Sequence, residues 1–208
     1  MTRVILTRHG ETQWNIEGRV QGAMDSPLTA NGIYQARVLA KRLLDEKISV
    51  LYSSDLPRAR ATADEIRKVL NLPEVKVEPA MRELSFGDWE GQEWNRLRGA
   101  YPDLFKLWEH NPDQVKIPGG ESMQHVTERA WSFFLSLADK HPEQTLCIVT
   151  HGMTLQLLIK RALGIPIEDW TNVPWQYNTA VNILDITTEG EVIPVLIADH
   201  KHLNLENK

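Results

Sequence analysis

Two short apolar runs, one near the start of the chain and one about two thirds of the way along it, end in a similar polar pattern. Residues 4–7 are followed by Arg8 and His9, and residues 147–150 are followed by His151. An apolar, β-branched run of this length is typical of a buried strand in a parallel sheet. In an open α/β sheet, ligands bind beyond the carboxyl ends of the strands. The pattern therefore predicts that the two imidazoles lie together in one crevice.

The remaining apolar positions alternate between helical and strand periodicity. Apolar residues three and four positions apart predict amphipathic helices, with Thr29 and Ser122 as N-caps, and short apolar runs predict strands. The expected helices cover residues 29–47, 57–70, 122–137 and 154–163, and the expected strands cover residues 50–53, 75–78, 180–185 and 192–197. The last eleven residues are polar and are expected to form a loose tail.

Residues 91–118 interrupt this alternation. The Tyr101-Pro102 step breaks the pattern, a short amphipathic piece follows, and Pro118 and two glycines close the segment. We interpret this segment as a small lid-like insertion over the crevice. The whole chain, residues 1–208, has a length that suits a single domain with such an insertion.

Composition indicates the broad class of protein. Hydrophobic residues make up 42% of the chain and charged residues 25%, which is ordinary for a soluble globular protein. No apolar run reaches the ~18 residues that a membrane-spanning helix needs. The chain enters a strand at once, so no signal peptide is expected. The one cysteine, Cys147, excludes an internal disulfide and suits a reducing compartment, so we expect a cytoplasmic protein.

The net charge of −5 is unevenly distributed along the chain. Residues 1–70 contain more Lys and Arg than Asp and Glu, whereas the remainder is acidic. An anionic ligand is therefore expected to be drawn to the N-terminal third. Lys and Arg form no dense patch, so nucleic acid is not expected as a partner, and neither is a membrane. A homodimer formed through an edge strand or a helix is a hypothesis that the sequence leaves open.

Five polar residues are expected at or near the strand ends: Arg8, His9, Arg58, Glu83 and His151. Two fixed cations suit phosphate oxygens. A histidine nitrogen can accept a phosphoryl group as a nucleophile, and a protonated glutamate can donate to the leaving oxygen. Arg58 is expected in the first turn of a helix, where a cation is unfavourable unless it faces an anion. The alternative for Arg58 is a solvated surface arginine.

Zinc is the rival ligand for the same residues. His9, His151 and Glu83 are all residue types that ligate zinc. Arg8 and Arg58 argue against this reading, because their positive charges would repel the metal ion. We therefore expect no metal and no cofactor.

The other histidines and several tryptophans have weaker contexts. Surface positions are expected for His110, His125, His141, His200 and His202. Each tryptophan taken alone is more often a core residue than part of a ligand site. Five of them nevertheless lie near the predicted site loops and are candidates for the wall of a substrate pocket: Trp14, Trp89, Trp94, Trp108 and Trp175.

Motifs along nearly the whole chain resemble those of the histidine phosphatase superfamily, in its phosphoglycerate-mutase-like branch. The most specific one is Arg8-His9-Gly10-Glu11-Thr12 followed by Trp14-Asn15. Further motifs that resemble the family follow in order: Leu28-Thr29, Ser53-Ser54-Asp55-Leu56, Pro118-Gly119-Gly120-Glu121-Ser122 and Val149-Thr150-His151-Gly152. The resemblance implies an α/β fold, a three-layer α/β/α sandwich whose mostly parallel sheet has an antiparallel edge strand. The last two predicted strands fit that edge.

The resemblance also implies a role for each predicted site residue. His9 would be the nucleophile that forms a phosphohistidine, and Glu83 would protonate the leaving group and then activate water. Arg8, Arg58 and His151 would bind the phosphoryl oxygens and stabilise the transition state. Substrate-binding positions are further implied for Asn15, Gln21, Gly22 and Gly152.

Two branches of this family compete for the function. Mutases usually carry a Tyr-Gly pair after the glutamate and a long insertion beyond it, whereas here a Leu-Ser-Phe-Gly segment follows Glu83 and the insertion is short. We therefore favour a phosphatase that hydrolyses small phosphomonoesters, with a small phosphorylated metabolite as substrate, over a cofactor-dependent phosphoglycerate mutase. The likeness extends equally to broad-specificity, phosphoserine and α-ribazole-phosphate phosphatases.

Two further expectations follow from the same residues. A non-catalytic phosphate-binding relative is disfavoured because His9 and Glu83 are both present. Asp88, Glu90 and Glu93 are expected near the mouth of the site, where they would disfavour polyanionic substrates such as bisphosphates.

Overall fold

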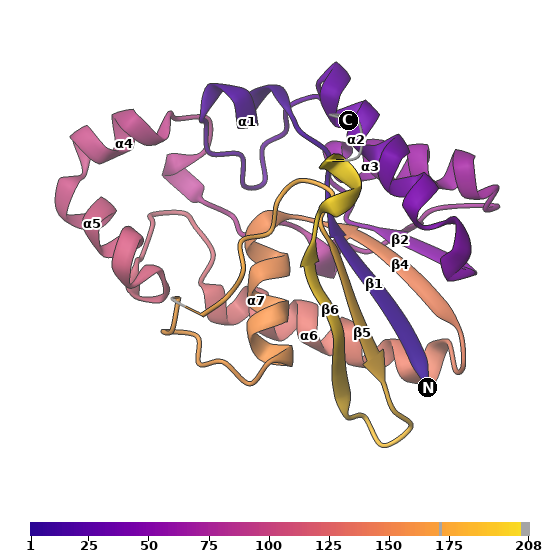
Figure 1. The fold of residues 1–208 in the computed structure, drawn as a ribbon. Coiled ribbons are helices and arrows are strands. Elements are labelled where there is room, and N and C mark those ends of the chain that lie inside the picture. Colours follow the sequence, from indigo (N-terminus) through magenta and orange to yellow (C-terminus); the bar gives the residue numbers. More distant parts are fainter. Residues whose placement is uncertain (171, 205–208) are drawn as a thin grey trace.

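A six-stranded mixed sheet forms the centre of the molecule (Figure 1). The computed structural model describes residues 1–170 and 172–204. The strands are β1 (Thr2–Arg8), β2 (Val50–Ser53), β3 (Lys76–Val77), β4 (Thr145–Thr150), β5 (Val181–Ile186) and β6 (Val192–Asp199). They lie in the order β3-β2-β4-β1-β5-β6, in which the first four are parallel and β5 is antiparallel to both of its neighbours. This mostly parallel sheet with antiparallel pairing towards one edge confirms the predicted fold class.

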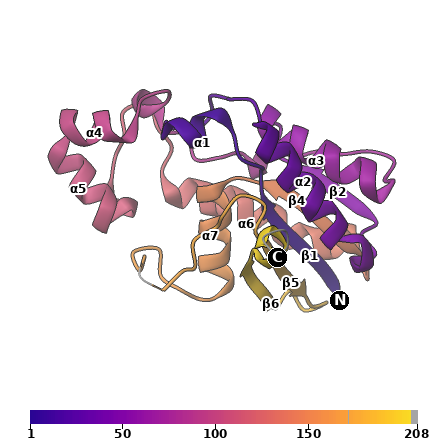
Figure 2. The same cartoon turned by 45° about the horizontal axis from the view of Figure 1, so that its top comes forward.

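Helices cover both faces of the sheet and give the molecule three layers (Figure 2). The four that do so are α2 (Ala30–Arg42), α3 (Pro57–Leu70), α6 (Met123–Lys140) and α7 (Gly152–Ala162). Side chains of a strand alternate between its two faces. Ile5 accordingly packs with α2 and α3, whereas Val4 and Leu6 pack with α6 and α7. The central strand β1 is therefore buried on both faces, as its continuous apolar run predicts.

Residues 87–117 extend away from the sheet and carry short helices (Figure 1). These are η3 (Gly87–Trp89), α4 (Trp94–Ala100), α5 (Pro102–His110) and η4 (Pro112–Gln114). A cluster of aromatic rings, with centroids of neighbours 5.3–6.4 Å apart, forms a small core for this segment. The rings belong to Phe86, Trp89, Trp94, Phe105 and Trp108.

Most element boundaries follow the sequence pattern, with local differences. The helix expected over residues 29–47 consists of α2 and a separate turn, η1 (Leu44–Glu46). Thr29 caps α2 as predicted, because its hydroxyl accepts a hydrogen bond from the amide of Gly32 (2.9 Å). The short helix α1 (Gln13–Glu17) follows the first strand loop and is capped by Thr12.

The expectation of a loose C-terminal tail is wrong for the part of it that the structure describes. Strand β6 continues to Asp199 and is followed by the turn η5 (Lys201–Asn204). His202 in this turn is buried beside the hydroxyl of Thr179. Residues 205–208, the rest of the expected tail, lie outside the described residues.

His141 is a second histidine whose expected surface position is wrong. It is buried at the end of α6, where its Nε2 atom lies 2.9 Å from the hydroxyl of Tyr52. The polar sequence around it gives no sign of this tertiary contact.

No helix of the described chain combines the length and the apolar character needed to cross a bilayer.

The loop after β1 packs directly on the first turn of α2. Gly10 and Gly32 make this close approach: a methyl group on Gly32 would overlap the backbone oxygen of Glu11, and one on Gly10 would overlap that of Gly32. The amide of Glu11 also donates to Oε1 of Gln35 (2.9 Å). The missing side chains at the two glycines therefore set how closely the His9 loop rests on α2.

Replacing Gly32 by alanine tests this close contact. Alanine normally stabilises a helix relative to glycine by about 1 kcal/mol. Here we expect G32A to lower the free energy of unfolding by roughly 1–3 kcal/mol, because the methyl group meets fixed backbone. Urea unfolding measures the change. The matched control is Asn31→Ala on the exposed face of the same turn, which should be neutral or slightly stabilising. Equal effects of the two substitutions would contradict the proposed contact.

Candidate active site

His9 and His151 lie side by side at the carboxyl ends of two neighbouring strands. Arg8 is opposite Thr150 in the parallel pairing of β1 with β4, and the amide of His9 donates to the backbone oxygen of Thr150 (2.9 Å). Both imidazoles are buried, and their ring centroids are 5.3 Å apart. The prediction that the two strand ends bring these rings together is confirmed.

The ring of His9 is held in one tautomer. Its Nδ1 atom lies 2.8 Å from the backbone oxygen of Gly10. Because a carbonyl oxygen can only accept, Nδ1 carries the proton and Nε2 keeps a free lone pair. Burial lowers the pKa of His9 well below its ordinary value, and the charges of Arg58 and Arg8 lower it further. His9 is thus a neutral imidazole with one nitrogen available as a nucleophile.

His151 is fully buried against His9. Its Nε2 atom lies 2.8 Å from the hydroxyl of Ser54, which also accepts a hydrogen bond from the amide of Leu56 (3.3 Å). Burial, followed by the charge of Arg58, lowers the pKa of His151 well below the ordinary value. Both histidines of the pair are therefore neutral over the physiological pH range.

Arg58 enters the site from the first turn of α3 and is almost completely buried. Its Nη1 group donates to the backbone oxygen of Met24 (2.7 Å) and to Oδ1 of Asp25 (3.1 Å), and its Nη2 group donates to the oxygen of Gly22 (2.7 Å). Burial lowers the pKa of Arg58, an effect that the charges of Glu83 and Asp25 oppose. The guanidinium keeps its proton at neutral pH. The alternative of a solvated surface arginine is wrong.

Arg8 supplies the second cation of the site, and its side chain is only partly buried. Its Nη1 group donates to the backbone oxygen of Gln176 (3.0 Å), and its guanidinium lies 5.9 Å from the ring centre of Trp175. Burial lowers the pKa of Arg8, and the nearby charge of Glu83 opposes that shift. Within the described residues, the Nε groups of Arg8 and Arg58 are buried and have no hydrogen-bond partner. Such unpaired donors are costly unless a ligand accepts from them.

The carboxylate of Glu83 lies at the N-terminus of α7. Its Oε1 atom accepts from the amides of Leu84 (2.9 Å) and Thr154 (3.1 Å), and Oε2 accepts from the amide of Met153 (3.2 Å). A side chain on Gly152 would come within 3.7 Å of Oε2 of Glu83 and 3.5 Å of Nε of Arg8. The open amides of the helix end orient the carboxyl group towards the cavity described below.

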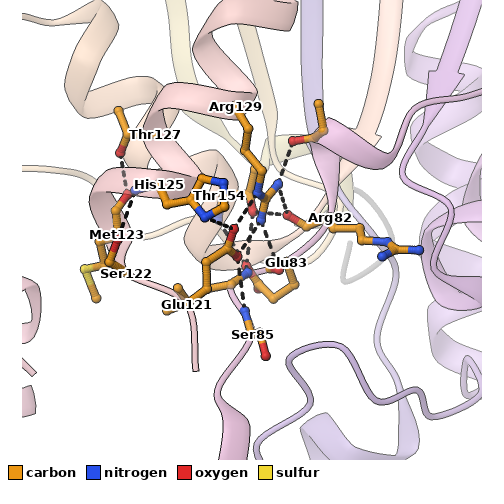
Figure 3. Close-up of polar contacts among 12 residues, drawn as sticks. Arg82, Glu83, Ser85, Glu121, Ser122, Met123, His125, Thr127, Arg129 and Thr154 are labelled. Carbon is orange, nitrogen blue, oxygen red and sulfur yellow. Dashed lines mark hydrogen bonds and ion pairs between the residues drawn. The ribbon is translucent and has the colours of Figure 1, made fainter. Parts of the chain in front are cut away.

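Arg129 on α6 fixes the backbone of the Glu83 segment (Figure 3). Its Nη1 group donates to the oxygens of Ala80 (2.6 Å) and Arg82 (2.9 Å), and its Nη2 group donates to that of Glu83 (3.2 Å). The other edge of the guanidinium forms two hydrogen bonds with Glu121 (2.8 and 2.9 Å). Although burial opposes it, Arg129 holds the pKa of Glu121 below its ordinary value. The guanidinium of Arg129 therefore ties three backbone carbonyl groups between residues 80 and 83 to helix α6.

Several residues that orient the site were not found from the sequence. The side-chain amide of Asn178 donates to the backbone oxygen of His9 (2.8 Å), and the hydroxyl of Thr62 accepts from the backbone amide of Gly10 (3.0 Å). Asp25 pairs with Arg58, as given above. These partners lie far along the chain from the residues they hold, so no local pattern marks them.

The acidic residues expected at the mouth have other roles. Glu90 turns inward, where Oε1 accepts from the amides of Ala23 (2.9 Å) and Phe86 (2.9 Å). Gly22 has a φ of 56°, and a side chain there would overlap the Glu90 carboxylate. Asp88, Glu90 and Glu93 are absent from the described residues that line the cavity. None of the three therefore lies in the cavity wall, and their expected effect on polyanionic substrates stays a prediction.

A cavity of about 610 Å³ opens over these groups. Eight of the nine predicted site residues line it: Arg8, His9, Asn15, Gln21, Gly22, Arg58, Glu83 and Gly152. The remaining one, His151, lies behind the ring of His9. The rest of the wall is largely aromatic and includes Trp14, Phe86, Trp94, Phe105, Trp108, Trp170 and Trp175. Of the candidate tryptophans, Trp89 is buried in the aromatic core and does not line the cavity.

The alternative of a zinc site does not fit the geometry. In the part of the chain that the structure describes, no three His, Cys, Asp or Glu side chains are grouped so that they could hold a metal ion. His9, His151 and Glu83 therefore do not form the ligand set that was considered. Cys147 is buried in strand β4, where desolvation raises the pKa of its thiol to about 12, so it is a structural residue.

Comparison with known proteins identifies the family to which the chain belongs. Residues 4–198 match the histidine phosphatase superfamily (branch 1). The chain belongs to the histidine phosphatase superfamily. Relatives of this histidine phosphatase that are named as phosphatases align with it nearly end to end, which makes it a phosphoric monoester hydrolase.

Curated relatives carry both phosphatase and mutase names. Phosphoserine phosphatase 1 of Hydrogenobacter thermophilus is 32% identical over 93% of this chain and 90% of its own length. A metal-independent phosphoserine phosphatase of Arabidopsis thaliana is 33% identical over 93% of this chain and 80% of its own length. A probable phosphoglycerate mutase, GpmB, of Escherichia fergusonii is 37% identical over 80% of this chain and 77% of its own length.

Solved structures share the whole fold of this histidine phosphatase. YhfR of Bacillus stearothermophilus superposes with a TM-score of 0.92 and 34% identity, covering 98% of this chain and 100% of that chain. A mycobacterial glucosyl-3-phosphoglycerate phosphatase superposes with a TM-score of 0.87 and 26% identity, covering 95% of this chain and 99% of that chain.

Replacing Arg129 by methionine tests its role in holding the Glu83 segment. We expect R129M to lower the free energy of unfolding by roughly 2–3 kcal/mol, because it leaves the Glu121 carboxylate and three carbonyl oxygens without their partner. We also expect phosphatase kcat to fall about tenfold or more, because the carboxyl group of Glu83 loses its fixed position. Chemical unfolding and steady-state kinetics measure the two effects.

The matched control is Arg37→Met, which removes an exposed ion pair with Glu65 on the helix layer. A surface pair of this kind contributes about 0–1 kcal/mol. If R129M and R37M alter stability and kcat equally, Arg129 has no special role in placing Glu83.

Proposed function

We propose that this histidine phosphatase hydrolyses small phosphomonoesters without a metal ion, through a phosphohistidine intermediate on His9. The observation that carries the proposal is the neutral ring of His9, whose Nδ1 proton is bound by the backbone oxygen of Gly10 and whose Nε2 lone pair is free near Arg8 and Arg58. A neutral imidazole of fixed tautomer is ready to attack phosphorus. The adjacent cations attract the dianionic phosphoryl group to that nitrogen.

In the first step, Nε2 of His9 forms a bond to phosphorus while the bond from phosphorus to the ester oxygen breaks. The guanidiniums of Arg8 and Arg58 stabilise the charge on the phosphoryl oxygens, and His151 contributes from its position against His9. Glu83, when protonated, transfers its proton to the departing alkoxide. The products of this step are the free alcohol, phosphohistidine and the Glu83 carboxylate.

In the second step, the Glu83 carboxylate removes a proton from water as the water oxygen attacks phosphorus. The bond from phosphorus to Nε2 breaks, which releases inorganic phosphate and restores neutral His9 and protonated Glu83. Asn15, Gln21, Gly22 and Gly152 bind the substrate around this centre, and all four line the cavity. We propose that residues 91–118 act as a lid-like insertion that limits access of solvent.

The absence of a metal requirement follows from charge. Arg8 and Arg58 already place two positive charges at the phosphoryl position, where a metal ion would otherwise act and would be repelled. The name of the Arabidopsis relative, a metal-independent phosphoserine phosphatase, describes the same property in a similar chain.

A phosphoglycerate mutase is the second candidate, favoured by the name of the GpmB relative. Both activities begin with the same phosphohistidine, and they differ in whether water or a sugar-acid hydroxyl accepts the phosphoryl group. Incubation of 3-phosphoglycerate with enzyme and excess EDTA, followed by phosphorus NMR, separates them. We expect release of inorganic phosphate at an undiminished rate in EDTA. Conversion to 2-phosphoglycerate would establish a mutase, and loss of activity in EDTA would refute metal independence.

The variant Glu83→Gln tests the two-step mechanism. With 4-nitrophenyl phosphate, the leaving group needs no proton, so E83Q should form phosphohistidine quickly and hydrolyse it slowly. We expect one rapid equivalent of 4-nitrophenol, then turnover reduced by about 10²–10⁴-fold, with an acid-labile phosphoenzyme isolated by quenching. His9→Ala should give neither the burst nor the phosphoenzyme.

The matched control is Glu65→Gln on α3, whose side chain pairs with Arg37 and does not line the cavity, and which should turn over substrate like the unmodified enzyme. Phosphate release by H9A at an undiminished rate would rule out the phosphohistidine route. No phosphate release by the unmodified enzyme from any monoester would identify a non-catalytic phosphate-binding relative instead.

A further inference from the structure

The cavity is much larger than the phosphoryl group that its charged end would hold. Arg8, His9, Arg58 and Glu83 occupy one part of its wall. Its total volume of about 610 Å³ falls in the range of about 300–1,000 Å³ that is typical of sites for drug-sized ligands. The remaining space must therefore receive the alcohol portion of the substrate.

Aromatic faces dominate that remaining space. The rings of Trp94 and Trp108 are stacked with centroids 5.9 Å apart, and Phe86 and Phe105 lie edge-on to them at 5.3 and 6.0 Å. All four line the cavity and also belong to the small core of residues 87–117. Because these rings hold one another in place, they form a fixed apolar wall and not a set of mobile side chains.

Two further tryptophans, Trp170 and Trp175, line the cavity. Trp170 lies beneath the ammonium group of Lys160, which is 3.9 Å from its ring centre and donates to the backbone oxygens of Ile167 (2.6 Å) and Asp169 (2.8 Å). Trp175 is 56% exposed and lies next to Arg8. An exposed tryptophan beside the phosphoryl end extends the aromatic surface up to the reacting group.

The cations on the lid side of the cavity are already paired. Among the described lining residues, these are Arg19 and Arg98. Arg19 pairs with Glu17 (2.8 Å) and Glu93 (3.0 Å), and Arg98 pairs with Glu109 (2.6 Å). A substrate carboxylate in this region would lose hydration without meeting a cation that lacks a partner.

From this wall we infer that the preferred substrate is a phosphomonoester whose alcohol carries an aromatic or similarly flat apolar group, which packs on the tryptophans that line the cavity. The inference rests on the proposed phosphatase function and adds a substrate class to it. Apolar transfer into the aromatic wall contributes to binding, whereas the charged ends of phosphoserine and 3-phosphoglycerate gain nothing there. This preference departs from the phosphoserine specificity that the names of two relatives state for those proteins.

The test compares 3-phenylpropyl phosphate with propyl phosphate and phosphoserine. All three release a primary alkoxide, so a preference does not arise simply from a better leaving group, as it would with aryl phosphates. We expect kcat/KM for 3-phenylpropyl phosphate to exceed both others by at least about tenfold. Equal kcat/KM values for the three substrates, or a higher value for phosphoserine, would overturn the inference. Phosphate release from any of them would still support the proposed phosphatase function. No release from any would instead overturn the proposed function.

Two wall variants locate the effect. Trp108→Leu and Trp175→Leu should each reduce the ratio of kcat/KM for 3-phenylpropyl phosphate over propyl phosphate by about threefold or more. The matched control is Trp131→Leu, because Trp131 is a half-buried tryptophan of α6 that stacks on Phe134 away from the cavity. It should leave the ratio unchanged. If W108L does not fold, the exposed position of Trp175 allows W175L to decide, and an unchanged ratio in W175L would then refute the aromatic site.

Discussion

Two neighbouring guanidinium groups, one on the buried Arg58 and one on the partly buried Arg8, set the conditions for the rest of this site. Arg8 and Arg58 keep their charge when buried, so the fold must compensate them with backbone oxygens and with the carboxylates of Glu83 and Asp25. That compensation is incomplete, because their Nε groups have no partner among the described residues. Burial lowers the pKa of His9, and the same charges lower it further, so the ring stays neutral. In the proposed mechanism, the positive field thus attracts the substrate and also keeps His9 ready as the nucleophile.

Parallel pairing of β1 with β4 brings these groups together. Residues that follow the two strands meet at one edge of the sheet. The strand pairing itself therefore places His9 beside His151. The helix that follows β4 begins at Gly152, and its open amides hold the carboxylate of Glu83. The sheet therefore positions the histidines, and the helix that starts from it positions the acid. Rigid elements, and not loops alone, define the reacting geometry.

The sequence predicted those parts of the fold and site that are written in local patterns. The strand ends at His9 and His151, the cap at Thr29 and the helix-borne Arg58 are each marked by a short run of neighbouring residues. Asn178, Thr62 and Arg129 could not be predicted in this way, because each contacts a segment more than forty residues away. The inward turn of Glu90 could not be predicted for the same reason. Its position near the predicted mouth gave no sign that backbone amides would turn it inward.

The residues proposed for phosphoryl transfer lie in short local motifs, whereas the residues proposed to bind the alcohol come from several distant segments. Phosphoryl transfer needs a few groups in fixed positions, so its residues follow directly after strands and at helix starts, where motifs are short. The alcohol of the substrate meets a wall assembled from α4, α5 and the segment that carries Trp170 and Trp175. Such a wall changes with every aromatic or charged substitution in those segments while the phosphoryl end stays intact. Relatives of similar identity can therefore belong to one family and still carry the names of phosphoserine phosphatase and phosphoglycerate mutase.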